Sequence, residues 1–535
     1  MELKTNVLYY GDNLEILGKH IPDESIDLIY LDPPFSSKRT FNVIFKEPSG
    51  EESAAQIRAF TDFWRWDEAA AVAYREIIET GPHRVSRLVA SLYEGVGPNA
   101  LMAYLVMMAL RLLDLRRVLK STGALYLHCD ATASHYLKVI LDSIFGPQNY
   151  RSEVVWRRTN VHNDPKRYGA VHDTILFYTK SSRWTWNQEH QSYTEAHIQT
   201  SYRKVDAEGR PYMEADLTAS KPGGDVEYEW KGVRPYKGRY WAYSREHMEE
   251  FEREGRLIYR KTGMPRLKRY LDEGPGVPVQ TLWMDIAPAK GSERLGYQTQ
   301  KPLALLERII SVSSNEGDIV LDPFCGCGTA VVAAHKLNRR WIGIDITHLA
   351  ITVMKERLRD SFSGIEFEVV GEPADVASAQ ALAEQDRYQF EWWALSLVNA
   401  KPVGDDRKKG ADRGIDGIIG FVETGGKAKR VVVQVKSGHV NPGQIRDLKG
   451  TMQREKAEIG LFLTLEPPTQ GMATEAASAG FYHSDLWNED YPRIQICTIE
   501  ELLEGKLPKL PRWAGGGFPK AQKIARKEGE QAEML

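Results

Sequence analysis

A short segment near the start of the chain contains the residue types that chemistry on an aromatic amine requires. Asp32-Pro33-Pro34-Phe35 follows the apolar run Ile26–Leu31, so Asp32 is expected where a buried strand emerges into a loop. The amino nitrogen of adenine is a poor nucleophile because its lone pair is delocalised into the ring. Asp32 and the carbonyl of Pro33 can accept both amino hydrogens, while Phe35 can stack on a flipped base. An ordinary turn is the alternative, and the preceding strand favours catalysis.

A second segment has the composition of a ligand-binding loop. Asp322-Pro323-Phe324-Cys325-Gly326-Cys327-Gly328-Thr329 follows the apolar run that ends at Leu321. Its two glycines allow the backbone to approach a ligand closely and to turn sharply into a helix. The next predicted strand, Arg340–Ile344, leads to Asp345, whose carboxylate can bind both ribose hydroxyls of an adenosine cofactor. The pattern favours S-adenosylmethionine, with a nucleotide loop or a merely structural turn as alternatives.

Three further segments complete a recognisable order of motifs. They are Tyr10-Gly11-Asp12-Asn13, Arg116-Arg117-Val118-Leu119-Lys120-Ser121-Thr122-Gly123 and Gln300-Lys301-Pro302. From residue 8 to about residue 358 the chain resembles a β-class DNA amino-methyltransferase, the class in which the DPPY/DPPF motif precedes the cofactor motif. DPPF rather than SPPY favours N6 of adenine over N4 of cytosine, which stays the alternative.

The resemblance implies S-adenosylmethionine as the methyl donor and gives roles to the matched residues. The catalytic residues that it implies are Asp32, Pro33, Pro34 and Phe35. The cofactor-binding residues that it implies are Asp12, Lys301, Pro302, Asp322, Phe324, Gly326, Gly328, Thr329 and Asp345. In the family, the segment around Lys301 closes over the methionine end of the cofactor.

Basic and aromatic residues are concentrated between the two motifs. Gly255–Tyr270 contains six basic residues and no acid, and aromatic residues are frequent from Trp184 to Tyr243. Basic side chains can contact phosphates, and aromatic ones can stack on bases or wedge between them. For any single residue, a solvated face beside a small β-rich core is the favoured interpretation. The region as a whole, 184–280, is predicted to recognise the DNA target because it fills the interval between the motifs.

The C-terminal part carries a different set of residues. Two apolar runs around Gly425-Gly426 predict a hairpin, with Asp416 near the start of one strand. Gln434 and Lys436, two residues apart, project from one face of the next strand. This set resembles the Mrr-like branch of the restriction-endonuclease fold. The resemblance implies that Asp416 and Gln434 bind Mg²⁺ and that Lys436 orients the attacking water. The alternative is an inert, DNA-binding remnant.

Composition limits the class of protein. The chain has 535 residues, enough for two or three domains, and a net charge of −3, so DNA contacts must come from local basic patches. Four cysteines do not form a disulfide framework. The stretch Leu101–Leu115 is interrupted by Arg111 and Asp114, so we expect a core helix rather than a membrane span. Met1–Thr5 has no signal-peptide character, and we expect a cytoplasmic, prokaryotic protein.

These observations together predict an α/β chain with two modules. We expect a doubly wound, Rossmann-like methyltransferase domain (1–183 and 281–370), an inserted recognition region (184–280), a linker (371–386), an Mrr-like nuclease domain (387–510) and a flexible tail (511–535). The predicted function is site-specific adenine-N6 methylation of double-stranded DNA, with a fused metal-dependent endonuclease, in restriction-modification or phage defence. The alternatives are cytosine-N4 methylation and a modification sensor whose C-terminal domain does not cut. A homodimer and association with other restriction or defence subunits both fit the sequence.

Overall fold

The computed structural model describes residues 3–34, 66–159, 166, 168–221, 226–295, 299–403, 414–512 and 521–524. The chain divides into two compact units. Gln188–Gln280 forms one unit, and Met1–Asn187 together with Thr281–Leu535 forms the other. The range predicted for the inserted region was 184–280. Phe35 and most of the predicted tail lie outside the described residues.

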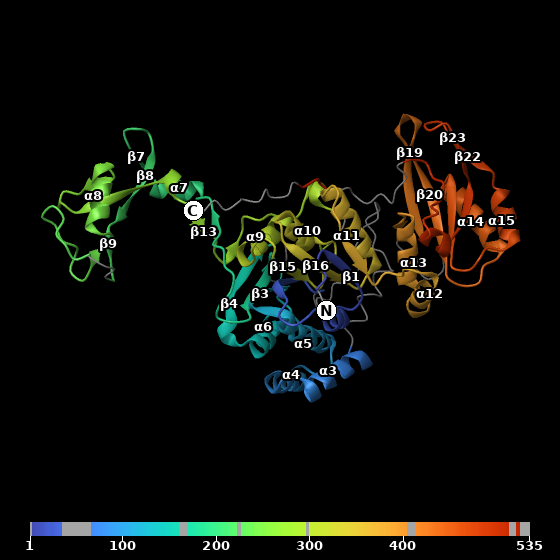
Figure 1. Ribbon diagram of the computed structural model, residues 1–535, viewed down its shortest axis with the longest axis horizontal. Coiled ribbons are helices and arrows are strands. Elements are labelled where there is room, and N and C mark those ends of the chain that lie inside the picture. The colour runs from blue at the N-terminus through green and yellow to red at the C-terminus, as the bar shows by residue number, and fades with distance from the viewer. Residues whose placement is uncertain are drawn as a thin grey trace. The chain divides into compact units, whose positions relative to one another are not determined.

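A nine-stranded sheet is the centre of the larger unit (Figure 1). Its order is β14-β4-β5-β3-β2-β15-β16-β1-β17. The strands are β1 (Val7–Tyr10), β2 (Ile26–Leu31), β3 (Leu119–Cys129), β4 (Tyr150–Arg157), β5 (His172–Thr179), β14 (Leu282–Trp283), β15 (Ile319–Asp322), β16 (Arg340–Asp345) and β17 (Glu368–Val370). β5 is antiparallel to both its neighbours, whereas the other neighbouring strands are parallel. The sheet therefore brings β2 and β15, far apart in sequence, together at its centre.

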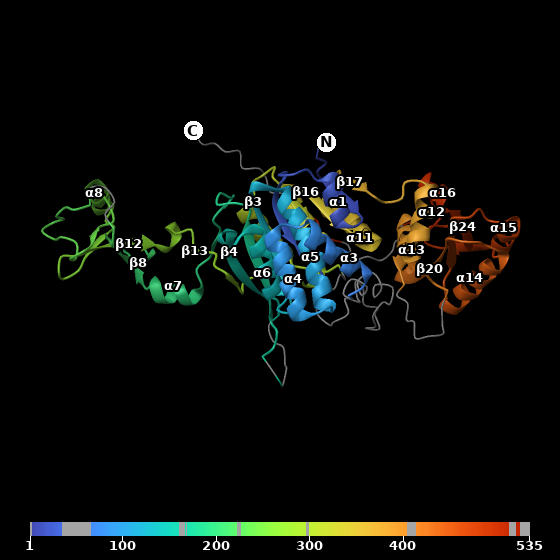
Figure 2. The ribbon, with the colours of Figure 1, turned by 90° about the horizontal axis from the view of Figure 1, so that it is seen from below.

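Helices cover both faces of this sheet (Figures 1 and 2). One layer contains α1 (Asn13–His20), α5 (Ala100–Val118) and α6 (Ser134–Phe145), and the other contains α9 (Leu303–Ser313), α10 (Thr329–Lys336) and α11 (His348–Ser361). A helical pair, α3 (Glu68–Thr80) and α4 (His83–Val96), packs on α5. Covered on both faces, the central strands are apolar without alternation, as parallel strands are. The doubly wound α/β architecture predicted for this part is thus observed.

The apolar stretch that suggested a core helix is α5. It is buried almost all round, and its Arg111 is only 7% exposed. Among the helices of the described residues, none is both long and apolar enough to cross a bilayer.

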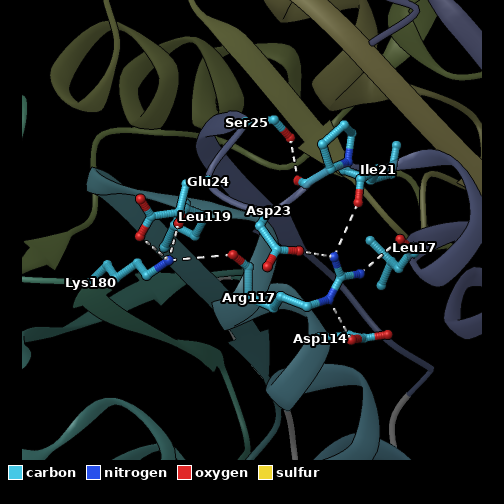
Figure 3. A network of polar contacts seen from close by, with 10 residues as sticks. Leu17, Ile21, Asp23, Glu24, Ser25, Asp114, Arg117, Leu119 and Lys180 are labelled. Carbon is cyan, nitrogen blue, oxygen red and sulfur yellow. Dashed lines mark hydrogen bonds and ion pairs between the residues drawn. The ribbon is translucent and has the colours of Figure 1, made fainter. Parts of the chain in front are cut away.

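The end of α5 is joined to the end of α1 and to the turn before β2 by a network of polar contacts (Figure 3). Arg117 donates hydrogen bonds to the carbonyl oxygens of Leu17 at 2.8 Å and Ile21 at 3.2 Å, at the end of α1. The same guanidinium pairs with Asp23 at 2.6 Å and Asp114 at 3.0 Å. Because carbonyls at a helix end have no partner within the helix, this arginine stabilises the turn that leads into β2.

The smaller unit is built on short antiparallel strands. Its four-stranded sheet has the order β11-β12-β8-β7, formed by β7 (Lys204–Val205), β8 (Pro211–Asp216), β11 (Leu257–Tyr259) and β12 (Pro265–Tyr270). Two strand pairs, β6 (His190–Gln191) with β13 (Val277–Pro278) and β9 (Thr218–Ala219) with β10 (Tyr240–Trp241), and the helices α7 (Glu195–Ser201) and α8 (Arg245–Arg253) complete it.

Many of the aromatic and basic residues expected to contact DNA have structural partners within this smaller unit. Trp230 and Trp241 are buried in its core. Arg256 pairs with glutamates and Arg266 with an aspartate. These contacts give the four residues structural roles within the smaller unit.

The C-terminal domain has a five-stranded sheet of order β18-β19-β20-β21-β24. Its strands are β18 (Lys401–Pro402), β19 (Gly417–Glu423), β20 (Lys427–Lys436), β21 (Ile459–Thr464) and β24 (Ile494–Thr498). On one face, α13 (Arg387–Leu397) packs with α12 (Val376–Gln385) and α16 (Ile499–Leu503); α14 (Pro442–Glu455) and α15 (Gln470–Ala477) are on the other. A small hairpin, β22 (Phe481–Ser484) and β23 (Glu489–Pro492), is added to it.

Two elements connect the nine-stranded sheet to the C-terminal domain. The last strand of the sheet, β17, pairs with β1 over Glu368–Val370. After the linker, α13 ends at Leu397 and is buried on two sides. Phe390 and Trp393 pack into the C-terminal core, whereas Trp392 packs against Leu349 and Val353 of α11.

Candidate active site

Three acidic residues meet at one edge of the nine-stranded sheet. Asp32 follows β2, while Asp322 and Asp345 end β15 and β16, and these three strands are adjacent and parallel. Since parallel strands present their carboxyl ends at the same edge, the fold brings the two predicted motifs together. The structure thus places the predicted catalytic aspartate beside both predicted cofactor-binding acids.

Asp32 is held by a lysine from the segment before α9. The Lys301 ammonium donates to Asp32 Oδ2, and Lys301 is only 9% exposed. No residue that the structure describes donates to Asp32 Oδ1, which leaves this oxygen free to accept a ligand hydrogen. Pro302, which follows Lys301, occupies the N-cap position of α9, and Pro33, which follows Asp32, is buried. The backbone on each side of the ion pair is therefore fixed. Phe35, the predicted base-stacking residue, is outside the described part of the chain.

The glycine-rich loop is fixed by Asp345. The backbone N–H of Gly326 donates to Asp345 Oδ2 at 2.9 Å, and Thr347 donates to Oδ1 through both its N–H and its hydroxyl, each at 2.9 Å. Burial raises the pKa of Asp345, and these hydrogen bonds counteract the rise. A carboxylate has about four acceptor positions, so Asp345 can still accept from a ligand hydroxyl. The predicted ribose-binding acid therefore also shapes the loop.

Gly328 begins α10 in a conformation that suits glycine. Its φ is +74°, and a Cβ built there would lie 2.6 Å from Cγ and 2.7 Å from Sδ of Met354. Gly326 also has a positive φ, +50°. Both glycines have the left-handed conformation that the predicted sharp turn into a helix favours, and the close approach to a ligand stays a prediction.

Asp322 is buried directly below this loop, at 4% exposure, and accepts a hydrogen bond from the N–H of Phe324 at 3.1 Å. Burial raises the pKa of Asp322 well above its usual range, and the neighbouring carboxylates of Asp32 and Asp345 raise it further. An ionised Asp322 in the ligand-free chain is thus unfavourable, whereas a ligand that brings a positive charge would relieve it.

We predict that Asp322→Asn stabilises the ligand-free chain. The pKa of this carboxyl group is higher in the folded chain than in the unfolded chain, where it is near 3.8. The folded state is therefore destabilised as the pH rises from 3.8 through the pKa of the folded state. Asn has the same shape and no charge, so at pH 7.5 the free energy of unfolding should increase by roughly 1–3 kcal/mol. Calorimetry at pH 7.5 and near pH 4 measures the change. A gain that stays constant down to pH 4 would contradict the assignment to ionisation.

Asp12 has a structural role in addition to the one predicted. Its carboxylate caps α1 through the N–H of Leu14 at 2.7 Å and pairs with the buried Arg111 at 2.8 Å. Arg111 also donates to Asn13 Oδ1 at 2.6 Å, and Asn13 in turn donates to the carbonyl of Pro323 at 2.8 Å. These contacts attach the Tyr10–Asn13 segment to the glycine-rich loop.

Several polar residues near the site were missed in the sequence. Tyr30 of β2 and His128 of β3 are 3.0 Å apart (Oη to Nδ1), and His128 Nε2 is 3.1 Å from Asp173 Oδ2. Although burial opposes it, the hydrogen bond from His128 lowers the pKa of Asp173. Arg357 of α11 contacts Cys327 and Thr329. Each lies in a strand or helix whose sequence is mostly apolar. The only signal in the sequence is a polar residue at a position where an apolar one is expected.

The residues predicted for nuclease chemistry occupy neighbouring positions in the C-terminal sheet. Asp416 precedes β19, and the N–H of Val435 donates to its Oδ2 at 2.7 Å. Gln434 is buried and its amide donates to the carbonyl of Gly414, while Lys436 is half-buried. β19 begins at Gly417, which pairs with Val433 of β20, and the N–H of Asp416 donates to the carbonyl of Val433 at 2.9 Å, so Asp416 lies next to the segment that contains Gln434. Among the described residues, no group of three or more His, Cys, Asp and Glu is arranged to hold a metal ion.

Two family models match different parts of the chain. A DNA methylase model for N6 and N4 methyltransferases matches residues 26–356. A model of a NACHT-associated inactive restriction endonuclease matches residues 391–504. The C-terminal domain is thus similar to an endonuclease domain described as inactive, and neither cleavage nor the predicted Mg²⁺ site is supported.

Three relatives cover different shares of the chain. The type II methyltransferase M.EcaI of Enterobacter cloacae is 33% identical over 257 residues, 47% of this chain and 57% of that protein. The type III StyLTI Mod subunit of Salmonella typhimurium is 27% identical over 353 residues, 62% of this chain and 50% of that protein. The DNA adenine methyltransferase YhdJ of Escherichia coli is 24% identical over 367 residues, 67% of this chain and 83% of that protein.

This chain spans about half the length of the first two relatives. The methylase match, by contrast, extends over more than half of the chain itself and contains both loops of the site. The chain therefore belongs to the DNA methylase family of N6 and N4 methyltransferases.

Proposed function

We propose that the chain transfers a methyl group from S-adenosylmethionine to N6 of adenine in double-stranded DNA, at a specific site. The observation that carries this proposal is the position of Asp32, with Oδ1 available and Oδ2 held by Lys301, one strand away from the glycine-rich loop. Adenine is preferred to cytosine because of the DPPF sequence and because the relative YhdJ is an adenine methyltransferase.

The residues of the second loop fit the proposed cofactor. Gly326 and Gly328 both have a positive φ that shapes the loop, Asp345 has acceptor capacity left for ribose hydroxyls, and Asp322 is a buried acid that a cationic amino group would satisfy. When bound, S-adenosylmethionine supplies an electrophilic methyl group on a sulfonium. Lys301, Pro302, Phe324, Thr329 and Asp12 line or anchor the same loop and complete the proposed cofactor set.

Asp32 would act directly on the base. Its Oδ1 accepts one N–H hydrogen bond from the adenine amino group, and the Pro33 carbonyl accepts the other, so the nitrogen lone pair leaves conjugation with the ring. After transfer, the nitrogen must lose one proton, and Asp32 is the nearest predicted acceptor. Phe35 would stack on the flipped base. Gln188–Gln280 would select the target sequence.

The product identifies the reaction. Unmethylated genomic DNA is incubated with the full chain and S-adenosylmethionine, hydrolysed to nucleosides and analysed by mass spectrometry, with Asp32→Ala as the inactive control. We expect N6-methyladenine. N4-methylcytosine alone would replace the adenine assignment, and the absence of any methylated nucleoside would overturn the proposal.

We further propose that the chain modifies DNA within a restriction-modification or phage-defence system and that its C-terminal domain acts without cutting. The relatives named as a type II methyltransferase and a type III Mod subunit support the first part. The second rests on the similarity to an inactive endonuclease. DNA binding by this domain and partner subunits are part of the same proposal.

We predict that Asp416→Ala and Lys436→Ala leave methylation within about twofold of wild type, because neither residue contacts the methylase site. The wild-type chain should not cut methylated or unmethylated plasmid with or without Mg²⁺, which gel electrophoresis measures. Mg²⁺-dependent cutting that Asp416→Ala abolishes would restore the nuclease interpretation.

A further inference from the structure

Arg357 is a buried cation beside the cofactor loop. It lies on α11 and is 5% exposed. Its Nη1 donates to the carbonyl of Cys327 at 2.8 Å and to the hydroxyl of Thr329 at 3.0 Å, and it is 3.6 Å from the sulfur of Cys327. Burial lowers the pKa of Arg357, which reflects the cost of keeping this charge away from water.

No carboxylate of the described residues forms an ion pair with this guanidinium. Glu293 raises the pKa of Arg357 without an ion pair, and the hydrogen bonds of this side chain go to the neutral groups of Cys327 and Thr329. A buried charge without a counter-ion is strongly unfavourable. Its presence under a ligand-binding loop therefore indicates that the ligand supplies an anionic group.

The rest of the site has the opposite charge. Asp32, Asp322 and Asp345 lie at the ends of adjacent strands, and the ammonium of Lys301 is already engaged with Asp32. A ligand carboxylate would be repelled on that side. It would be attracted on the side of Arg357 and of the N-terminus of α10, where Thr329 begins the helix.

We infer that Arg357 selects the amino-acid end of the cofactor by attracting its carboxylate, while the acidic side receives the ammonium group. This inference rests on the proposed use of S-adenosylmethionine and names a further residue of that site. Arg357 contacts the backbone of the loop, so it is a positioning residue that acts by its charge. A series of hydrogen bonds also connects Arg357 to Asp32. Arg357 donates to the Thr329 hydroxyl, which donates to the carbonyl of Lys301 at 3.4 Å, and the Lys301 ammonium donates to Asp32.

Two ligands separate the role of charge from the role of loop shape. S-adenosylhomocysteine has the amino-acid end, and 5′-methylthioadenosine has the same adenosine and thioether without it. Isothermal titration of the full chain with each ligand compares wild type, Arg357→Met, which keeps length without charge, and Arg357→Lys, which keeps charge. We expect Arg357→Met to weaken the binding of S-adenosylhomocysteine by ~10-fold or more and the binding of methylthioadenosine by less than ~2-fold. Arg357→Lys should stay within ~3-fold of wild type for both ligands.

Each other outcome has a definite meaning. The inference would be overturned if Arg357→Met weakened the binding of both ligands equally, or weakened the binding of neither. If wild type binds neither ligand, the proposed cofactor itself is wrong. If Arg357→Met does not fold, decarboxylated S-adenosylhomocysteine tests wild type instead. It should bind ~10-fold more weakly than the parent compound, and equal affinity would overturn the inference.

Discussion

Asp32→Ala is expected to reduce methyl transfer by ~10³-fold or more while S-adenosylhomocysteine still binds within about threefold of wild type. The substitution removes the acceptor of the amino hydrogen, and Asp32 makes no described contact with the glycine-rich loop. Tritiated methyl incorporation at saturating cofactor, together with calorimetric titration, measures the two effects separately.

Asp32→Ala also removes the carboxylate that pairs with the buried ammonium of Lys301. The double variant Asp32→Ala with Lys301→Met removes both members of this ion pair. Lost thermal stability should then recover, and activity should not, because the acceptor is still missing. Recovery of activity in the double variant would mean that the broken ion pair, rather than the missing acceptor, caused the loss.

Gly328→Ala is expected to weaken S-adenosylhomocysteine binding by ~100-fold and to lower the free energy of unfolding by roughly 2–4 kcal/mol. The added Cβ would approach Met354 to 2.6 Å, and Met354 is fully buried, so it has little room to move. The left-handed backbone adds strain that any residue with a Cβ experiences. Titration calorimetry and chemical denaturation measure both losses.

Two variants show which cause dominates. Gly95→Ala, in α4, places a Cβ where nothing lies within 4 Å and should change stability only slightly, in the favourable direction. Met354→Ala combined with Gly328→Ala removes the collision and keeps the backbone strain, so it should recover most of the binding. Full ligand affinity in the single variant would mean that the loop does not require glycine at this position.

The two loops of the site were predictable because their chemistry is local in sequence. Asp32 and the glycine-rich loop each follow an apolar run, and parallel strands deliver such ends to one edge of a sheet. The sequence did not indicate Arg111, Arg357 or His128, because each lies in a segment that reads as core and its polar partner comes from a distant part of the chain.

The C-terminal prediction shows the limit of a motif. Asp416, Gln434 and Lys436 were correctly placed on neighbouring positions of a hairpin, since hairpin pairing follows from the two apolar runs and the glycine pair. Cleavage requires more than adjacent positions. It also depends on a bound metal ion, and the similarity of this domain is to an inactive endonuclease. The arrangement of residues was therefore predictable where the activity was not.

The packing of α13 has a consequence for how genes of this kind can recombine. The two family matches are separated by residues 357–390, which suggests a place where a methylase could gain or lose its companion domain. Yet Trp392 packs with Leu349, Val353 and Cys327 of the methylase, and Gln389 accepts a hydrogen bond from the N–H of His348 at 3.2 Å. A crossover upstream of residue 387 would keep every methylase motif and expose an apolar patch beside the cofactor loop. A successful exchange of domains would have to carry α13 with the methylase.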